Sequence, residues 1–239
     1  DVALGGSAVG TGINTPKGYL EALSKSLVQV TGFNYRVHNN KFEHLSLKIA
    51  LAHTAGALKN LCSTLYKIAN DIRFLGSGPR LGYGELILPA NEPGSSIMPG
   101  KVNPTQCESM LMVTLNVMGN MDTIMSANKE GNFELNVMMP LIINKMVEST
   151  HLISDSMHSF VKFCLRDLKA NEEQLKYNVD ANLMSATSLN PILGYETVAI
   201  IVKEAYQKNK TFKEVGVEMG YFNEAEYEAW RQQAHDETE

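Results

Sequence analysis

A loop bounded by glycine and proline holds the residues best suited to chemistry in this sequence. Gly94 and Gly100 allow backbone amides to point inward and to approach an anion closely, while Lys101 adds a cation and Asn103 adds an amide. A Ser95 hydroxyl held among amides and Lys101 would have a stabilised alkoxide, and could act as a nucleophile or a base. Such a loop suits a substrate that bears carboxylates and passes through a carbanion. The whole segment reads Gly94-Ser95-Ser96-Ile97-Met98-Pro99-Gly100-Lys101-Val102-Asn103-Pro104.

The residues of this loop also fit a simpler interpretation, a solvated Gly/Ser/Pro segment with an exposed lysine. The histidines nearest to Ser95 in sequence are His53 and His151, so the pattern does not indicate a catalytic triad. From composition alone, both an anion-handling site and a plain surface loop stay open.

Three long segments with helical periodicity must position the loop. Apolar residues recur every three or four positions over residues 45–74, 106–127 and 141–165. Each segment has about 25 residues, which at ~1.5 Å per residue gives a rod about 35–40 Å long. Long amphipathic helices usually bury their apolar stripes in a bundle, often one shared between subunits. We therefore expect an oligomer built on a bundle.

Residues 76–104, which join the first two rods, exceed by far the connection of two to eight residues that is usual in helix bundles. Connections of that length are usually functional or disordered. The polar residues in this one, including Ser95, Lys101 and Asn103, favour a functional loop over a linker. The only apolar run that suggests a strand is the short Leu86-Ile87-Leu88, so the predicted fold is all-α.

Beyond about residue 170 the helical stretches become shorter. Pro191 suits a first helical turn, residues 211–214 have the capping-box pattern, and Asn223 begins a similar helix start. The sequence therefore predicts a helical-bundle domain over residues 1–170, containing the loop region 76–104, and a small helical domain over residues 171–239.

The composition excludes several classes of function. Of the 239 residues, 44% are hydrophobic and 20% charged, as in ordinary globular proteins. No apolar run approaches the roughly 20 residues that span a bilayer, and no segment resembles a signal peptide. A net charge of −5 argues against nucleic acid or an anionic membrane as partner. The three cysteines and six histidines lack metal spacing, so we expect no metal and a reducing compartment, the cytoplasm or alternatively the mitochondrial matrix.

The loop resembles the signature loop of the fumarase/aspartase superfamily, and Thr105-Gln106-Cys107-Glu108, which follows it, resembles class II fumarases in particular. The resemblance extends from residue 5 to about residue 230. It implies a central bundle of long helices and a homotetramer in which each active site is assembled from three subunits. Further matching segments are Gly5–Gly12, Lys67–Arg80, Gly84-Glu85-Leu86 and Gly131–Asn136.

The resemblance implies the reversible hydration of fumarate to (S)-malate through a carbanion (aci-carboxylate) intermediate, with a small dicarboxylate as substrate and no metal or organic cofactor. Ser95 matches the base that removes the proton from C3 of malate, and Glu108 matches the acid that pairs with a catalytic histidine. The residues that match substrate-binding positions, or lie among them, are Ser96, Lys101, Val102 and Asn103.

One departure limits the implied activity. Family members have an N-terminal domain with a Thr-His motif, and no segment of this chain matches that motif. We therefore expect a C-terminal fragment that does not turn over fumarate alone. Two other interpretations stay open. An aspartate ammonia-lyase is disfavoured by Gly100, where that enzyme usually has Ala, and by residues 105–108. A non-catalytic helical oligomerisation module is the second.

Overall fold

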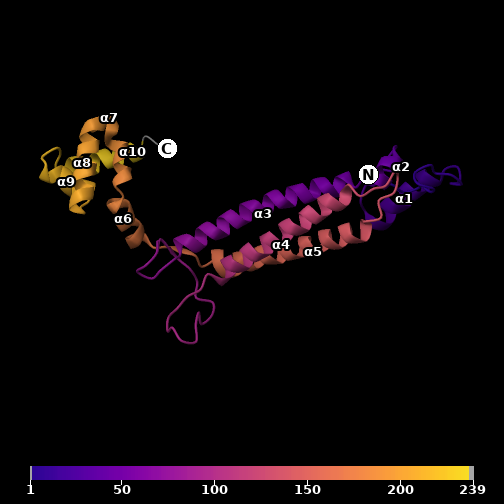
Figure 1. Ribbon diagram of the computed structural model, residues 1–239, viewed down its shortest axis with the longest axis horizontal. Helices are drawn as coiled ribbons and strands as arrows, with labels where there is room; N and C mark the ends of the chain where they lie inside the picture. The colour runs from indigo at the N-terminus through magenta and orange to yellow at the C-terminus, as the bar shows by residue number, and fades with distance from the viewer. Residues whose placement is uncertain (1, 237–239) are drawn as a thin grey trace. The chain divides into compact units, whose positions relative to one another are not determined.

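The computed structural model describes residues 2–236, so Asp1 and the last three residues of the predicted C-terminal domain lie outside the described part. Helices dominate it, which confirms the all-α prediction; the single small sheet has two strands of two residues each (Figure 1). The chain divides into two compact units. Asp1–Leu75 and Leu88–Leu168 form the first, and Gly76–Ile87 with Lys169–Glu239 form the second.

The first unit is a bundle of three long helices that run side by side, α3 (Ile49–Leu75), α4 (Thr105–Asn128) and α5 (Met139–Phe160) (Figure 1). They have 27, 24 and 22 residues, which confirms the three predicted rods. Small side chains along α3 let α4 approach closely, and unbranched methionines fill the space between α4 and α5. The residues fully buried between these helices include Ala55, Cys62, Ala69, Cys107, Met110, Val117, Met121, Ile124 and Ile142.

The first rod begins later than its apolar pattern predicts. The chain between α2 (Lys41–Ser46) and α3 is extended at Leu47, with φ −124° and ψ 152°. The backbone nitrogen of Lys48 donates to Oδ1 of Asn128 at 2.5 Å, so the end of α4 supplies a partner for an amide at the start of α3. The apolar spacing continues across this break, which is why periodicity alone misses it.

The end of the third predicted rod also differs. After α5 the chain continues as the π-helical turn η1 (Val161–Leu165) and then leaves the bundle. At the opposite end of the bundle lie α1 (Tyr19–Thr31), α2 and the glycine-rich turns of residues 5–12 (Figure 1). None of the residues of α1 is buried.

The second unit is a small helical body with its own core. Strand β1 (Leu86–Ile87) pairs antiparallel with β2 (Lys169–Ala170). The capping box predicted at Thr211 is present, and Asn223 Oδ1 accepts from the nitrogen of Glu226 at 2.9 Å, as predicted. The helices that follow β2 are α6 (Glu172–Ala181), η2 (Leu183–Leu189), α7 (Asn190–Leu193), α8 (Tyr195–Lys208), α9 (Phe212–Glu218) and α10 (Glu224–Asp236). Their core includes Leu189, Val198, Ile201, Ala205, Phe212, Val215, Phe222 and Tyr227.

Candidate active site

The loop of residues 94–104 is closed on itself at a narrow neck. The nitrogen of Gly94 donates to the carbonyl oxygen of Lys101 at 3.1 Å, and Nδ2 of Asn103 donates to the carbonyl oxygen of Gly94 at 2.6 Å. A β-carbon on Gly94 would lie 2.2 Å from the carbonyl oxygen of Lys101. Only glycine therefore allows the two sides of the neck to come this close.

Ser95 lies just inside the neck and is half-buried. Its Oγ accepts hydrogen bonds from the backbone nitrogens of Ile97 and Met98, both at 3.2 Å. Two N–H donors aimed at one hydroxyl oxygen favour its negatively charged form. The structure thus places the Ser95 hydroxyl among amides, while the Lys101 side chain makes no hydrogen bond or ion pair within the described part of the chain.

The other predicted site residues lie on the same loop or directly after it. Ser96, Lys101 and Val102 are exposed, and Asn103 is half-buried because its amide closes the neck. Glu108 is exposed in the first turn of α4, where the positive end of the helix dipole favours a carboxylate. The structure therefore gathers these residues at the end of the bundle where α4 begins, with the charged groups of Lys101 and Glu108 open to solvent.

Two thiols lie beneath the loop. Cys107, in the first turn of α4, and Cys164, in the turn η1, are 0% and 3% exposed. A hydrogen bond with Cys164, together with burial, raises the pKa of the Cys107 thiol. Cys107 is therefore a protonated part of the core and not a nucleophile.

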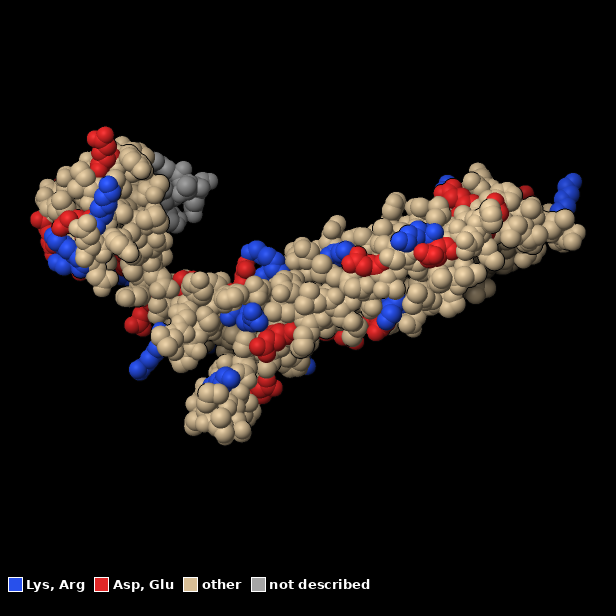
Figure 2. Space-filling model, in the orientation of Figure 1, with Lys and Arg blue, Asp and Glu red and all other residues tan. Residues whose placement is uncertain are grey.

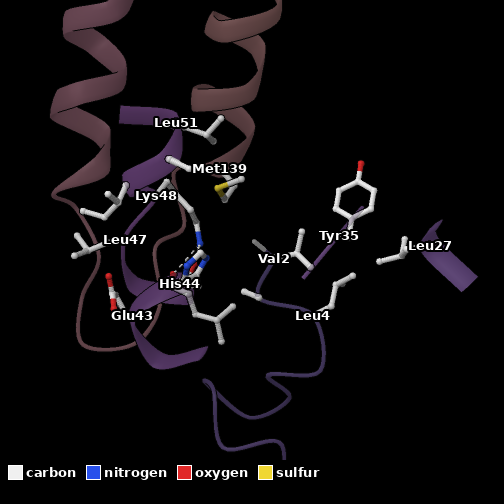
Figure 3. A pocket seen from close by; sticks show the side chains of 14 residues that line it. Val2, Leu4, Leu27, Tyr35, Glu43, His44, Leu47, Lys48, Leu51 and Met139 are labelled. Atoms are coloured by element: carbon white, nitrogen blue, oxygen red, sulfur yellow. Dashed lines mark hydrogen bonds between the residues drawn. The ribbon is translucent and has the colours of Figure 1, made fainter. Parts of the chain in front are cut away.

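A cavity of about 600 Å³ lies at the other end of the bundle, and none of the predicted site residues lines it (Figure 3). Its walls are mostly apolar, with Tyr35, Glu43, His44 and Lys48 as the charged or titratable groups. Nζ of Lys48 donates to the carbonyl oxygens of His44 and Leu45, and burial lowers the pKa of Lys48. Sequence reasoning missed this cavity because its walls come from segments far apart in the chain.

The described residues hold no cluster of three or more His, Cys, Asp or Glu side chains that could bind a metal. Among residues 2–236, no helix is both long and apolar enough to cross a membrane.

Comparison with known proteins places this loop and bundle in a family. Residues 1–119 match a family model described as lyase, and residues 186–234 match one described as the C-terminus of fumarase C. The chain belongs to the class II fumarase family and corresponds to its C-terminal portion. The all-α long-helix bundle is thus the fumarase fold.

Several relatives can be compared directly with this chain. It is 50% identical over 229 residues to a class II fumarate hydratase of Thermosynechococcus vestitus, which covers 96% of this chain and 49% of the relative. It is 47% identical over 230 residues to a mitochondrial fumarate hydratase of Rhizopus oryzae, covering 96% of this chain and 47% of the relative. The crystal structure of a class II fumarase from Schistosoma mansoni superimposes with a TM-score of 0.89 and 39% identity, covering 97% of this chain and 52% of that chain. The chain thus spans about half the length of the relatives it matches.

Proposed function

We propose that the protein to which this chain belongs is a fumarate hydratase, a lyase that reversibly hydrates fumarate to (S)-malate. The observation that carries the proposal is the Ser95 hydroxyl, which accepts two backbone N–H groups inside a loop that matches the family's signature. The names of the relatives support the same activity.

In the malate-to-fumarate direction, Ser95 as the alkoxide takes the proton from C3 of malate. The electron pair left on C3 delocalises into the neighbouring carboxylate and gives the aci-carboxylate. Lys101 neutralises part of this charge, and the N–H groups of Ile97 and Met98 stabilise the alkoxide before the transfer. The hydroxyl on C2 then leaves as water, with a proton from an acid outside this chain. Ser96, Val102 and Asn103 shape the binding site for the substrate carboxylates.

Glu108 has a supporting role in this mechanism. Its carboxylate is exposed at the start of α4, so it is open to a histidine contributed by another segment of the protein or by another subunit. A carboxylate that pairs with a histidine fixes its orientation and raises its basicity. We propose that this histidine is the partner that the present chain does not itself supply, and that the chain alone is inactive.

We also propose that the site is shared between subunits of a homotetramer. The glycine-rich turns at residues 5–12 and the loop at 94–104 both match the family, yet they lie at opposite ends of the bundle (Figure 1), about 40 Å apart by the helical rise of α3. They can join one site only if they come from different copies.

Exposed apolar side chains along the bundle support an assembly that covers them. Figure 2 shows the charged groups of the bundle in small clusters of both signs, separated by wide uncharged surface. The exposed apolar residues of the three helices include Leu61, Ile68, Met112, Leu115, Met125, Ile143 and Val147.

The test is a fumarase assay on a longer parent protein that carries Ser95→Ala. We expect at least a roughly 10²-fold loss of the hydration rate, the scale typical of a lost acid–base group. Ser109→Ala, an exposed serine on α4, is the matched control and should keep full activity. Normal activity of Ser95→Ala would show that the proposed role of Ser95 is wrong.

The same preparation distinguishes the other interpretations. Release of ammonia from aspartate by the parent would identify an aspartate ammonia-lyase. No reaction with either substrate, and no malate binding, would indicate a non-catalytic oligomerisation module. For the present chain, light scattering should give the mass of a tetramer, and a stable monomer would contradict the shared site. The compartment we propose is the cytoplasm, with the mitochondrial matrix as the alternative.

A further inference from the structure

The turn at the end of α5 is wound differently from the rest of the helix. The nitrogen of Arg166 donates to the carbonyl oxygen of Val161 at 3.0 Å, five residues earlier, as in a π-helix. Such turns are rare and occur often at functional sites. Because the helix ends here, its last carbonyl groups have no partners within the helix and must find them elsewhere.

One of these carbonyl groups accepts a hydrogen bond from the stem, the short segment from Asn91 that leads into the loop of residues 94–104. Nδ2 of Asn91 donates to the carbonyl oxygen of Phe163 at 2.8 Å, across 72 positions of sequence. Asn91 lies three residues before Gly94, so this bond fixes the chain just outside the neck. The side chain reaches it from an exposed position.

The stem that leads out of the loop is bound to the same region. Oγ of Ser159, in the last turn of α5, donates to Oε1 of Gln106 at 2.9 Å. Gln106 lies two residues after Pro104, in the first turn of α4. Directly beneath, Cys107 and Cys164 bury their side chains against the same stems. Both sides of the loop are therefore held on the end of α5 and η1.

We propose that Asn91 and Ser159 are positioning residues that orient the loop of residues 94–104 relative to Glu108. The neck bonds close the loop but do not set its direction, because they join only its own residues. The bond of Asn91 joins the segment before the loop to η1, and the bond of Ser159 holds the first turn of α4, directly after the loop, on the end of α5. Both flanks of the loop are therefore tied to the rigid bundle from which Glu108 projects. That these two bonds help catalysis rests on the proposed function. That they hold the loop in place does not depend on it.

The first experiment measures amide hydrogen exchange on the present chain. Asn91→Asp keeps the shape of the side chain, removes the donor and places a negative charge beside the Phe163 carbonyl oxygen. We expect the amides of Gly94 and Lys101 to exchange roughly fivefold faster, the effect of losing about one hydrogen bond. Glu92→Gln, an exposed neighbouring change, should leave this exchange unaltered.

Ser159 provides an independent test of the second bond. Ser159→Ala removes the donor and should also speed exchange at the neck, while Ser159→Thr keeps a hydroxyl and should restore most of the protection. Unchanged exchange in both Asn91→Asp and Ser159→Ala would overturn the proposal, whatever the activity.

The second experiment measures hydratase kinetics of Asn91→Asp in a longer parent protein. We expect kcat/KM to fall at least about tenfold while the thermal unfolding midpoint stays unchanged. A loop that points in the wrong direction places its catalytic groups poorly and slows the reaction, but it does not unfold the bundle. Faster exchange with normal kinetics in an active parent would overturn the proposed role in catalysis. If the unsubstituted parent has no hydratase activity, the proposed function fails, and the exchange result alone decides whether these bonds hold the loop.

Discussion

The backbone nitrogen of Gly94 donates to the carbonyl oxygen of Lys101 at 3.1 Å, with no room between them for a side chain. Gly94→Ala would place its β-carbon 2.2 Å from that oxygen, so the neck must open. We expect a local cost of about 1–3 kcal/mol, as for other overpacked positions. The measurement is the rate of limited proteolysis within the loop, which should rise.

Gly100 is the matched control for this change. Unlike Gly94, it has a backbone in the left-handed region that favours glycine, with φ +75°, but a β-carbon there would meet no atom within 4 Å. Gly100→Ala should cost only about 1 kcal/mol of backbone strain and leave proteolysis close to normal. Equal proteolysis rates for Gly94→Ala and the unsubstituted chain would contradict the closed neck.

A buried hydrogen bond joins α4 to α5. Nδ2 of Asn120 donates to Oγ of Ser149 at 3.1 Å, and the two residues are 7% and 0% exposed. Asn120→Ala leaves the Ser149 hydroxyl without this partner and should lower the free energy of unfolding by about 1–3 kcal/mol. Urea unfolding measures the loss. Asn116→Ala, at an exposed position of the same helix, should change it by less than about 0.5 kcal/mol; an equal effect of both changes would refute the argument.

The rings of His38 and His44 lie 3.9 Å apart between centroids. Burial, followed by the charge of His38, lowers the pKa of His44 from its usual value of 6.5. The unfolded chain therefore binds the proton more readily, so stability is complete above pH 6.5 and is lost as pH falls through the lower, folded pKa. Thermal unfolding followed from pH 7 down to pH 5 should show this loss.

His44→Gln removes the titrating group, and the thermal midpoint should then depend less steeply on pH over that range. His53→Gln, at an exposed position on α3, is the control and should keep the original dependence. If the thermal midpoint of His44→Gln depends on pH as steeply as that of the unsubstituted chain, groups other than His44 cause the loss of stability below pH 7.

All three cysteines of the chain are buried. Burial raises the pKa of Cys62, and a hydrogen bond with Cys164 together with burial raises the pKa of Cys107. The same hydrogen bond lowers the pKa of Cys164, whose side chain is only 3% exposed. A buried thiol reacts slowly with alkylating agents because the reagent cannot reach its sulfur. Mass spectrometry after iodoacetamide treatment at about pH 8, just below the usual thiol pKa of ~8.5, should find no adduct on the folded chain and three adducts after unfolding. The variant Ser109→Cys, with its thiol on the exposed face of α4, should gain one rapid adduct. Rapid labelling of Cys107 would show that the base of the loop opens.

The sequence by itself determined the features that depend on neighbouring residues. Apolar spacing of three and four predicts the three rods, because helix periodicity is local. The capping box at Thr211 satisfies amides within one turn, so its pattern is visible in four consecutive residues. The loop between the first two rods, with Ser95 and Lys101, also stands out directly, since glycine, proline and polar residues interrupt the period.

The tertiary structure decided what depends on partners far apart in the chain. The break before α3 is accompanied by a bond between Lys48 and Asn128, 80 positions apart. The direction of the loop involves a bond between Asn91 and Phe163, 72 positions apart. Neither pair has a local signal, because each residue type could bind many partners or water with similar free energy. Packing of the bundle selects the partner, and with it where the loop presents Ser95.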